Sequence, residues 1–277
     1  MGRAKRIPYG VSDFIDIIER NQYYVDKTMY IPKLEDEPDA LFFIRPRRFG
    51  KSLFISMLRA YYDIKRKDKF DKLFGNLWIG SHPTENQGKY QVLFLDFSKI
   101  GGSIDQLEEN FNAYCNECID SFIETYQEYY PERVVESVLK AKTAARKLNA
   151  IGIAAEKKNL PLYLIVDEYD NFTNVVLNEQ GEEVYTALTH ASGFYREIFK
   201  VFKGMFSKIF MTGVSPVTLD DLTSGFNIGW HISTKPAFNQ MLGFSTEDVR
   251  ELFTYYKENG EIRPDSDVEA IINEMKP

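Results

Sequence analysis

Four short and almost purely apolar runs constrain the fold of this chain more than any other feature. They occupy residues 41–44, 92–97, 163–167 and 209–212, and a weaker fifth run covers residues 229–232. A strand reads this way when both faces of its sheet are buried, because neither face then meets water. Longer stretches with helical spacing separate the runs. The sequence therefore predicts an α/β fold with a mostly parallel central sheet.

Helical spacing is clearest directly after the first apolar run, where residues 51–64 place their large apolar side chains on one face. Two further helices are expected over residues 104–130 and 131–156, and another over residues 193–203. The stretch 75–88 contains Gly, Asn, Ser, His and Pro, a composition typical of a loop.

The end of the chain carries two more helix signals. Ser245 or Thr246 is expected to cap one helix, whose first turn is acidic. A polar turn at residues 263–267 then precedes a second helix, Val268–Met275. These signals predict the start of a small helical subdomain that is cut short where the sequence stops.

Length and composition limit the class of protein. The 277 residues suit one large domain or a domain plus a small appendage, and a hydrophobic content of 44% argues against disorder. Three parts are expected: a segment at 1–39 that packs on the core, the core at 40–240, and the start of a lid subdomain at 241–277. The net charge of −7 disfavours a dedicated nucleic-acid binder.

Membrane and metal signals are weak. No apolar run approaches the roughly 20 residues that span a bilayer, and no apolar stretch follows the charged N-terminus as it would in a signal peptide. We therefore expect no membrane partner and a cytoplasmic location. Cys115 and Cys118 form a lone C-x-x-C, whereas a zinc site needs four ligands. We expect these cysteines to lie one turn apart on a helix.

The first motif that carries chemistry is Gly50-Lys51-Ser52, placed after the first apolar run and at the start of a helix. A helix N-terminus presents unpaired N–H groups and a partial positive charge, so it attracts phosphate. We expect Lys51 to reach the β- and γ-phosphates of a nucleotide as a catalytic cation, and the Ser52 hydroxyl to coordinate Mg²⁺. The alternative is a solvated basic loop that caps a helix.

This motif departs from the pattern G-x-x-x-x-G-K-[S/T] at its first position, where Arg45 replaces a glycine that eases the turn. Pro46 also lacks an N–H group. Residues 47–52 keep their N–H groups, so most of the anion-binding nest survives, and the arginines add positive charge where a nucleotide would sit. The predicted nucleotide-binding set is Arg45, Pro46, Arg47, Arg48, Phe49, Gly50, Lys51 and Ser52.

Two adjacent acids, Asp167 and Glu168, end the third apolar run. Such a pair is typical of the Walker B motif, in which the Asp holds hydrated Mg²⁺ and the Glu polarises the attacking water. We predict Asp167, together with Ser52, as the metal-binding residues and Glu168 as the catalytic base. Asp170 follows, and a turn cap is the favoured role for it over an acid that supports the metal ligands. The alternative is an ordinary buried strand that ends in acids at a turn.

The fourth apolar run ends in small polar residues that include Thr212 and Ser215. In P-loop ATPases with a catalytic glutamate, this strand lies between the strand of the P-loop and the strand of the acidic pair. Its terminal polar residue contacts the γ-phosphate or positions water. Thr212 is the first candidate for this catalytic role and Ser215 the second, against an ordinary strand exit. The three motifs occur in the required chain order, which strengthens each of them.

With their surroundings, these motifs resemble the AAA-ATPase-like family, bacterial proteins that are often fused to a C-terminal nuclease domain of the PD-(D/E)xK superfamily. The similar segments are residues 7–14, 23–28, 45–52, 92–97, 166–170, 212–216 and 224–228. The resemblance implies a P-loop NTPase fold, a three-layer sandwich whose mostly parallel sheet has the strand order 5-1-4-3-2, with the start of a helical lid. It also implies that the missing first glycine is a family trait.

The resemblance carries functional expectations as well. ATP and Mg²⁺ are the expected ligands, and the chain is expected to be a P-loop ATPase, with an oligomer as one option. The natural protein is expected to continue into a nuclease domain, through which any nucleic acid would be contacted. The leading hypothesis is an ATP-hydrolysing domain that regulates or powers an attached nuclease or partner. The alternatives are a nucleotide-binding regulatory module without turnover, and a DNA- or protein-interaction module with a vestigial P-loop.

Overall fold

The computed structural model describes residues 4–102, 106–171, 174, 176–177, 194–215, 229–263 and 265–275. Its centre is a five-stranded sheet in which all neighbouring strands are parallel. The strands are β1 (Ala40–Ile44), β2 (Gln91–Asp96), β3 (Leu162–Asp167), β4 (Lys208–Gly213) and β5 (Trp230–His231). Each strand falls on one of the predicted apolar runs. The three strands β1, β3 and β4 are almost wholly buried, whereas β2 at one edge alternates between buried and half-buried residues.

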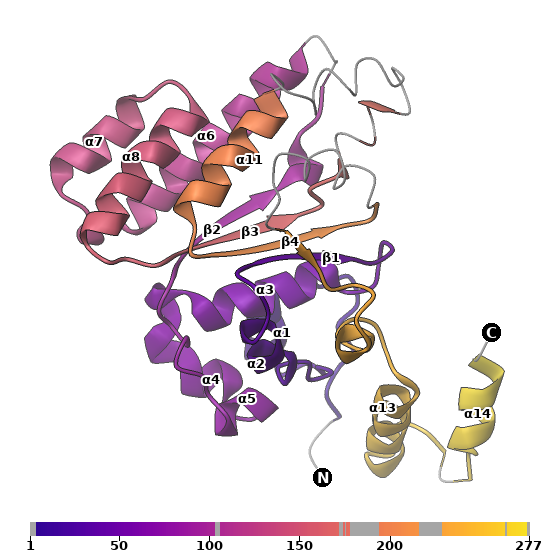
Figure 1. Ribbon diagram of the computed structural model, residues 1–277. Helices are drawn as coiled ribbons and strands as arrows, with labels where there is room; N and C mark the ends of the chain where they lie inside the picture. The colour runs from indigo at the N-terminus through magenta and orange to yellow at the C-terminus, as the bar shows by residue number, and fades with distance from the viewer. Residues whose placement is uncertain are drawn as a thin grey trace.

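The strands lie in the order β2-β3-β4-β1-β5. Read from the other edge strand, this is the order 5-1-4-3-2 that the family resemblance implied, with β4 between β1 and β3. Helices cover both faces of the sheet, which gives the predicted three-layer sandwich (Figure 1). The α/β fold class is therefore confirmed.

One face of the sheet is covered by the helix after β1 and by the shorter helices of the N-terminal part (Figure 1). These elements are α1 (Phe14–Glu19), α2 (Tyr30–Glu35), α3 (Lys51–Tyr62), η1 (Ile64–Lys69), α4 (Phe70–Phe74) and α5 (Trp78–Ser81). Aromatic rings fill the space between them, and Phe14 and Phe74 stack with their ring centroids 5.0 Å apart. The prediction of a plain loop over residues 75–88 was wrong, because α5 forms one turn there. The carboxylate of Asp26 accepts a hydrogen bond from the first N–H of that turn, at Trp78.

The other face carries the longer helices (Figure 1). They are α6 (Leu107–Thr125), α7 (Glu132–Lys140), α8 (Ala144–Lys157) and α11 (Phe194–Met205), with the short turns η2 (Phe97–Lys99) and η4 (Gln127–Tyr129). The single helix predicted over residues 131–156 was wrong. Ala141 is extended, and the Thr143 side chain caps a new helix by accepting a hydrogen bond from the Arg146 N–H. The two cysteines lie one turn apart on α6, as predicted. None of the described helices is long and apolar enough to cross a membrane.

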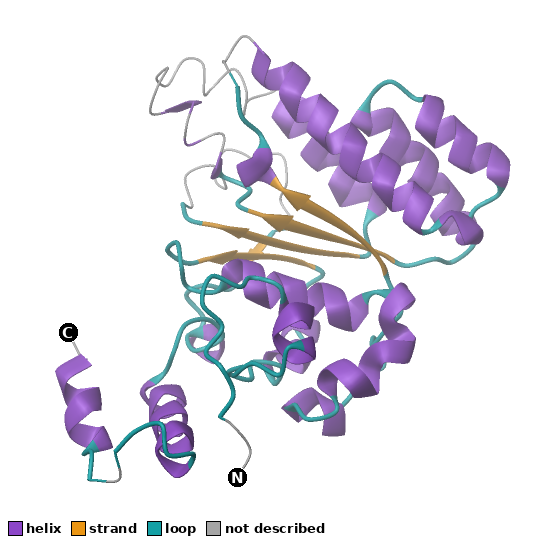
Figure 2. Cartoon of the chain, turned by 180° about the vertical axis from the view of Figure 1, so that it is seen from behind, coloured by secondary structure: helices purple, strands orange, loops and turns teal. Residues whose placement is uncertain are grey.

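The C-terminal part adds η5 (Pro236–Phe238), α13 (Thr246–Glu258) and α14 (Val268–Met275). Ser245 caps α13, as predicted, and it forms a reciprocal capping box with Asp248. Both helices stand apart from the sheet on the side where the N-terminal segment runs (Figure 2). An ion pair of 2.6 Å between Lys27 and Asp248 joins that segment to α13.

Candidate active site

The predicted site residues meet at the carboxyl ends of three neighbouring strands. Arg45 follows β1, Asp167 ends β3, and Thr212 lies one residue before the end of β4. Because β4 pairs with both β1 and β3, these positions come together although Arg45 is more than a hundred residues from Asp167 and Thr212 in the chain. The arrowheads in Figure 2 mark this edge. Ligands of open α/β sheets bind at this edge.

The loop between β1 and α3, residues 45–50, has the backbone shape of an anion-binding turn. Gly50 has a φ of +89° and Arg48 a φ of +68°, both in the left-handed region that favours glycine. A Cβ placed on Gly50 would have no neighbouring atom within 4 Å. The open space over Gly50 and the unpaired N–H groups in the first turn of α3 together fit a phosphate group.

Lys51 closes this loop from within. Its side chain is only 5% exposed, and its ammonium group donates hydrogen bonds to the carbonyl oxygens of Arg45 and Pro46 at 2.9 and 3.1 Å. Burial lowers the pKa of Lys51, while the carboxylates of Asp167 and Glu168 act in the opposite direction. The ammonium group therefore lies between the loop and the acidic pair.

Asp167 is the centre of a buried polar cluster. Its carboxylate accepts hydrogen bonds from the hydroxyls of Ser52, at 2.6 Å, and Thr212, at 2.5 Å. It also accepts one from the N–H of Glu168, at 3.0 Å. Asp167 is 3% exposed, and an ionised carboxylate can be buried in this way only when such partners surround it. One side chain thus joins all three predicted motifs.

The oxygen atoms of Ser52 and Asp167 are suitable ligands for Mg²⁺. This ion takes hard oxygen ligands and is commonly held by one or two carboxylates, retained water and the phosphates of a substrate. Within the described part of the chain, no group of three or more His, Cys, Asp and Glu side chains is placed to hold a metal ion. The oxygens of Ser52 and Asp167 therefore fit a magnesium ion whose other ligands would come from water and a nucleotide.

Glu168 combines an unusual backbone with a perturbed carboxyl group. Its φ is +50°, a conformation that costs roughly 1–3 kcal/mol for a residue other than glycine. Burial, and next the charge of Asp167, raise the pKa of Glu168, whereas the cations of Lys51 and Arg47 lower it. A half-buried carboxyl group with a raised pKa is a suitable proton acceptor.

Asp170 ties the acidic pair to the loop after β4, a role that the sequence did not reveal. Its buried carboxylate accepts hydrogen bonds from the N–H groups of Val214 and Ser215, at 2.9 and 2.5 Å. It also accepts one from the amide group of the Asn174 side chain, at 3.0 Å. Gly213 is required beside it, because a Cβ there would lie 2.7 Å from the Asp170 carboxylate.

The three arginines of the loop lie in three different surroundings. The Arg45 guanidinium donates a hydrogen bond to the carbonyl of Ser233, at 3.0 Å, on the far side of β1. Arg48 lines an apolar cavity. Arg47 is exposed, and its Nη2 lies 3.5 Å from the Oδ1 of Asn171, next to the acidic pair. The sequence placed all three near a nucleotide without separating these positions.

An apolar cavity of about 470 Å³ adjoins the loop. The N-terminal segment, the start of α3 and the chain before α13 enclose it. Its lining includes Ile7, Pro8, Tyr24, Val25, Arg48, Phe49, Gly50, Leu53, Met241, Leu242, Phe244 and Leu252. The Phe49 carbonyl also accepts a hydrogen bond of 3.0 Å from the Gly243 N–H. Because these segments are distant in the chain, no local sequence pattern could have predicted the cavity.

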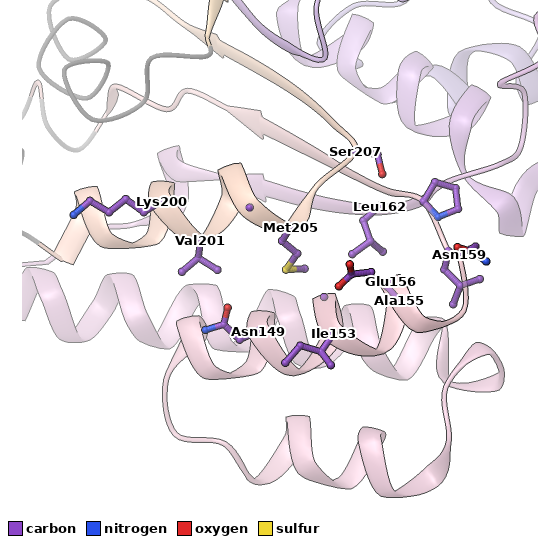
Figure 3. A pocket seen from close by; sticks show the side chains of 14 residues that line it. Asn149, Ile153, Ala155, Glu156, Asn159, Leu162, Lys200, Val201, Met205 and Ser207 are labelled. Atoms are coloured by element: carbon purple, nitrogen blue, oxygen red, sulfur yellow. The ribbon is translucent and has the colours of Figure 1, made fainter.

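A second cavity, of about 770 Å³, lies at the opposite edge of the sheet. It is lined from α8 by Ile153 and Glu156 and from α11 by Val201 and Met205, close to the start of β3 at Leu162 (Figure 3). It shares no residue with the loop or with the acidic pair.

A parallel sheet of this strand order, with a Gly-Lys-Ser turn after β1 and an acidic pair after β3, defines the chain as a P-loop NTPase domain. The family described as "Predicted AAA-ATPase" matches residues 8–223. The chain therefore belongs to the AAA-ATPase-like family, which confirms the resemblance stated above.

Two further similarities place the chain among other proteins. An uncharacterized protein in the vnfD 5′ region of Azotobacter chroococcum mcd 1 is 26% identical over 267 residues. The alignment covers 90% of this chain but 45% of that relative, so the chain spans less than half the length of the relative. The structure of the Aeropyrum pernix ORC2 protein in ADPNP–ADP complexes is 13% identical, with a TM-score of 0.37 over 93% of this chain and 57% of that one.

Proposed function

We propose that this domain binds ATP together with Mg²⁺ and hydrolyses the ATP. The observation that carries the proposal is the cluster around Asp167, whose carboxylate accepts hydrogen bonds from both Ser52 and Thr212. These bonds join the start of α3, where phosphate would bind, to the end of β4. A solvated basic loop would not need a buried carboxylate at its base, because such a carboxylate is costly to bury.

The phosphates of ATP would bind to the N–H groups of residues 47–52 and to Lys51. The ammonium group of Lys51 donates hydrogen bonds to two loop carbonyls. When ATP binds, it would donate to the β- and γ-phosphates instead. Ser52 and Asp167 would hold Mg²⁺, which supplies charge neutralisation at the phosphate oxygens. Glu168 would accept the proton of the attacking water, and Thr212 would orient that water or the γ-phosphate.

The apolar cavity beside the loop would take the adenine base. Its volume of about 470 Å³ lies in the range of small-molecule sites, about 300–1,000 Å³. It begins at Arg48, Phe49 and Gly50, the residues next to the phosphate-binding turn. A base in the cavity and phosphates on the loop would therefore belong to one continuous ligand. We further propose that ATP hydrolysis regulates or powers an attached domain or a partner, and a nuclease is the leading candidate.

Calorimetric titration of the protein with ATP and Mg²⁺, combined with phosphate-release kinetics, tests the proposal. We expect wild type to bind and hydrolyse ATP, and Lys51→Ala to lose most of its affinity. Glu168→Gln should bind normally but hydrolyse about 100- to 10,000-fold more slowly, because it lacks the base. Glu156→Gln, which changes a glutamate beside the second cavity, should match wild type. Absence of binding by wild type would overturn the proposal, and binding without turnover would favour the regulatory module.

A further inference from the structure

Arg45 is held away from the open side of the phosphate-binding loop. Its guanidinium donates to the carbonyls of Ile44 and Ser233 at 2.9 and 3.0 Å and lies over the Phe43 ring at 4.4 Å. Burial of this group lowers the pKa of Arg45. Its contacts link the loop to the chain after β5, and Nη1 of the guanidinium donates both of these hydrogen bonds. Arg45 is therefore a structural cation.

Arg47 has the opposite character. It is exposed, and in the described part of the chain its guanidinium has no carboxylate within ion-pair distance. Its one hydrogen bond reaches Asn171 at 3.5 Å, the outer limit of such a bond. Asn171 in turn donates its backbone N–H to the carbonyl of Glu168 at 2.9 Å. The guanidinium thus lies beside the turn that carries the predicted base, and little energy holds it there.

The position of Arg47 brings it to the proposed phosphate site from two directions. It belongs to the loop that ends at Lys51, and its Nη2 lies beside Asn171 on the turn of Glu168. The guanidinium therefore borders the space between Lys51 and Glu168, where the terminal phosphate would sit if Lys51 binds it. An exposed cation that forms no ion pair with the described residues can turn into that space without breaking such a pair.

We propose that Arg47 is a catalytic residue that supplies, within its own chain, the positive charge that stabilises the transferring γ-phosphoryl group. This inference rests on the proposed ATPase function. It gives the arginine-rich form of the loop a purpose: Arg45 fixes the loop, and Arg47 serves the reaction. No arginine from a second copy of the chain is then needed for hydrolysis.

The chemical step is an in-line displacement at the γ-phosphorus. Water forms a new P–O bond, the bond from the γ-phosphorus to the β–γ bridging oxygen breaks, and the products are ADP and inorganic phosphate. Glu168 accepts the proton of the water, and negative charge builds on the leaving oxygen of ADP. Arg47 donates hydrogen bonds to the oxygens where charge develops, so its contribution is greater in the transition state than in the bound ATP.

The first test is the kinetics of Arg47→Ala. We expect kcat to fall at least about 100-fold, in line with arginines that stabilise transferring phosphate, while the affinity for a non-hydrolysable ATP analogue changes only a few-fold. Trapping of ADP with aluminium fluoride, which mimics the transition state, should be lost in this variant and partly restored in Arg47→Lys. Arg20→Ala, on the surface of α1, removes an equivalent charge and should match wild type.

A mixing experiment decides between one chain and two. Arg47→Ala is mixed with Lys51→Ala, which keeps Arg47 but cannot bind the phosphates. If Arg47 acts within its own chain, the mixture has only the summed activity of its components at every protein concentration. Recovery that grows with concentration would show that Arg47 acts on a neighbouring copy and would overturn the inference.

Other outcomes separate this inference from the proposed function. Full kcat and full aluminium fluoride trapping in Arg47→Ala, with an active wild type, would overturn the inference and leave the ATPase proposal standing. An inactive wild type that does not bind ATP would overturn both. Equal melting temperatures of Arg47→Ala and wild type exclude misfolding as the cause of a lost kcat, and we expect equality because Arg47 is exposed.

Discussion

The strands of the central sheet have carboxyl ends, which carry the loop 45–50 and the acidic pair, and amino ends on the opposite side. We call these two sides the carboxyl edge and the amino edge of the sheet. They differ in backbone conformation and in buried charge. At the carboxyl edge, Arg48 and Glu168 have positive φ angles although neither is glycine. At the amino edge, the positive φ before β3 belongs to Asn159, a residue type that tolerates it at the end of a helix. The first edge also buries Lys51 and Asp167.

This difference shows at which edge the fold contains features that cost free energy. Left-handed backbone at residues other than glycine and buried charges each cost free energy, and the surrounding structure must hold them in place. The amino edge places its left-handed backbone at Asn159, a residue type that tolerates it. There Lys208, which begins β4, pairs with the exposed carboxylate of Asp39 at 3.4 Å. Strain and buried charge concentrated at one edge support the proposal that this edge is the functional one.

The largest effect should come from exchanging one carboxylate at each edge. Asp167→Asn removes a proposed magnesium ligand but keeps the size of the side chain. Its amide oxygen can still accept from Thr212 and its NH2 group can donate to the Ser52 hydroxyl oxygen, so the fold should survive. We expect kcat for ATP to fall on the order of 100- to 1,000-fold. Asp39→Asn breaks only the exposed pair with Lys208 and should change neither kcat nor the melting temperature. Steady-state phosphate release measures both variants, and equal losses of kcat would break the comparison.

A pair of glycines isolates the backbone term. A Cβ would have no neighbour within 4 Å at Gly50 or at Gly204, so crowding cannot explain any difference between them. Gly50→Ala must place alanine at a φ of +89° and should destabilise the protein by about 1–2 kcal/mol. Gly204→Ala lies in α11 and should stabilise it by about 0.5–1 kcal/mol, because alanine favours helix.

Urea unfolding curves measure both glycine variants against wild type. Opposite signs would support the view that the loop after β1 is strained and that the helix at the other edge is not. A Gly50→Ala variant as stable as wild type would contradict it, since the loop would then tolerate a side chain at this conformation.

Much of the fold follows from local sequence patterns. The strands were predicted because burial on both faces leaves a short apolar run, as in β3. The site residues Lys51, Ser52, Asp167 and Glu168 were predicted because each lies directly beside such a strand or at the start of a helix. Local patterns also gave one wrong prediction. The residues around Thr143 look helical, yet one helix ends before Thr143 and its side chain caps the start of the next.

The remaining features depend on contacts between distant segments. The bond from the Val214 N–H to the Asp170 carboxylate joins residues 44 positions apart, and the ion pair of Lys27 with Asp248 joins residues 221 positions apart. No spacing rule encodes such contacts, so the sequence could not predict the role of Asp170 or the apolar cavity beside the loop. The separate surroundings of Arg45 and Arg47 also required coordinates, because the two residues are neighbours in sequence.

The smallest expected effect is a gain in stability at the functional edge. The pKa of Glu168 is raised above its ordinary value of 4.5 by burial and by Asp167, so its ionised form is less favourable in the folded chain than in the unfolded one. Wild type should therefore lose stability as the pH rises from 4.5 through the folded pKa. Glu168→Gln cannot ionise and escapes this loss.

We expect Glu168→Gln to melt above wild type once the pH exceeds the folded pKa of Glu168, and the gap to close below pH 4.5. Differential scanning calorimetry across this pH range measures the gap, and Glu156→Gln at the other edge serves as the matched control. A variant that melts below wild type at pH 7 would mean that the ionised carboxylate stabilises the fold. The carboxyl edge would then lack the free-energy cost that we infer for it. A gap that persists unchanged below pH 4.5 would trace the gain to packing rather than to charge.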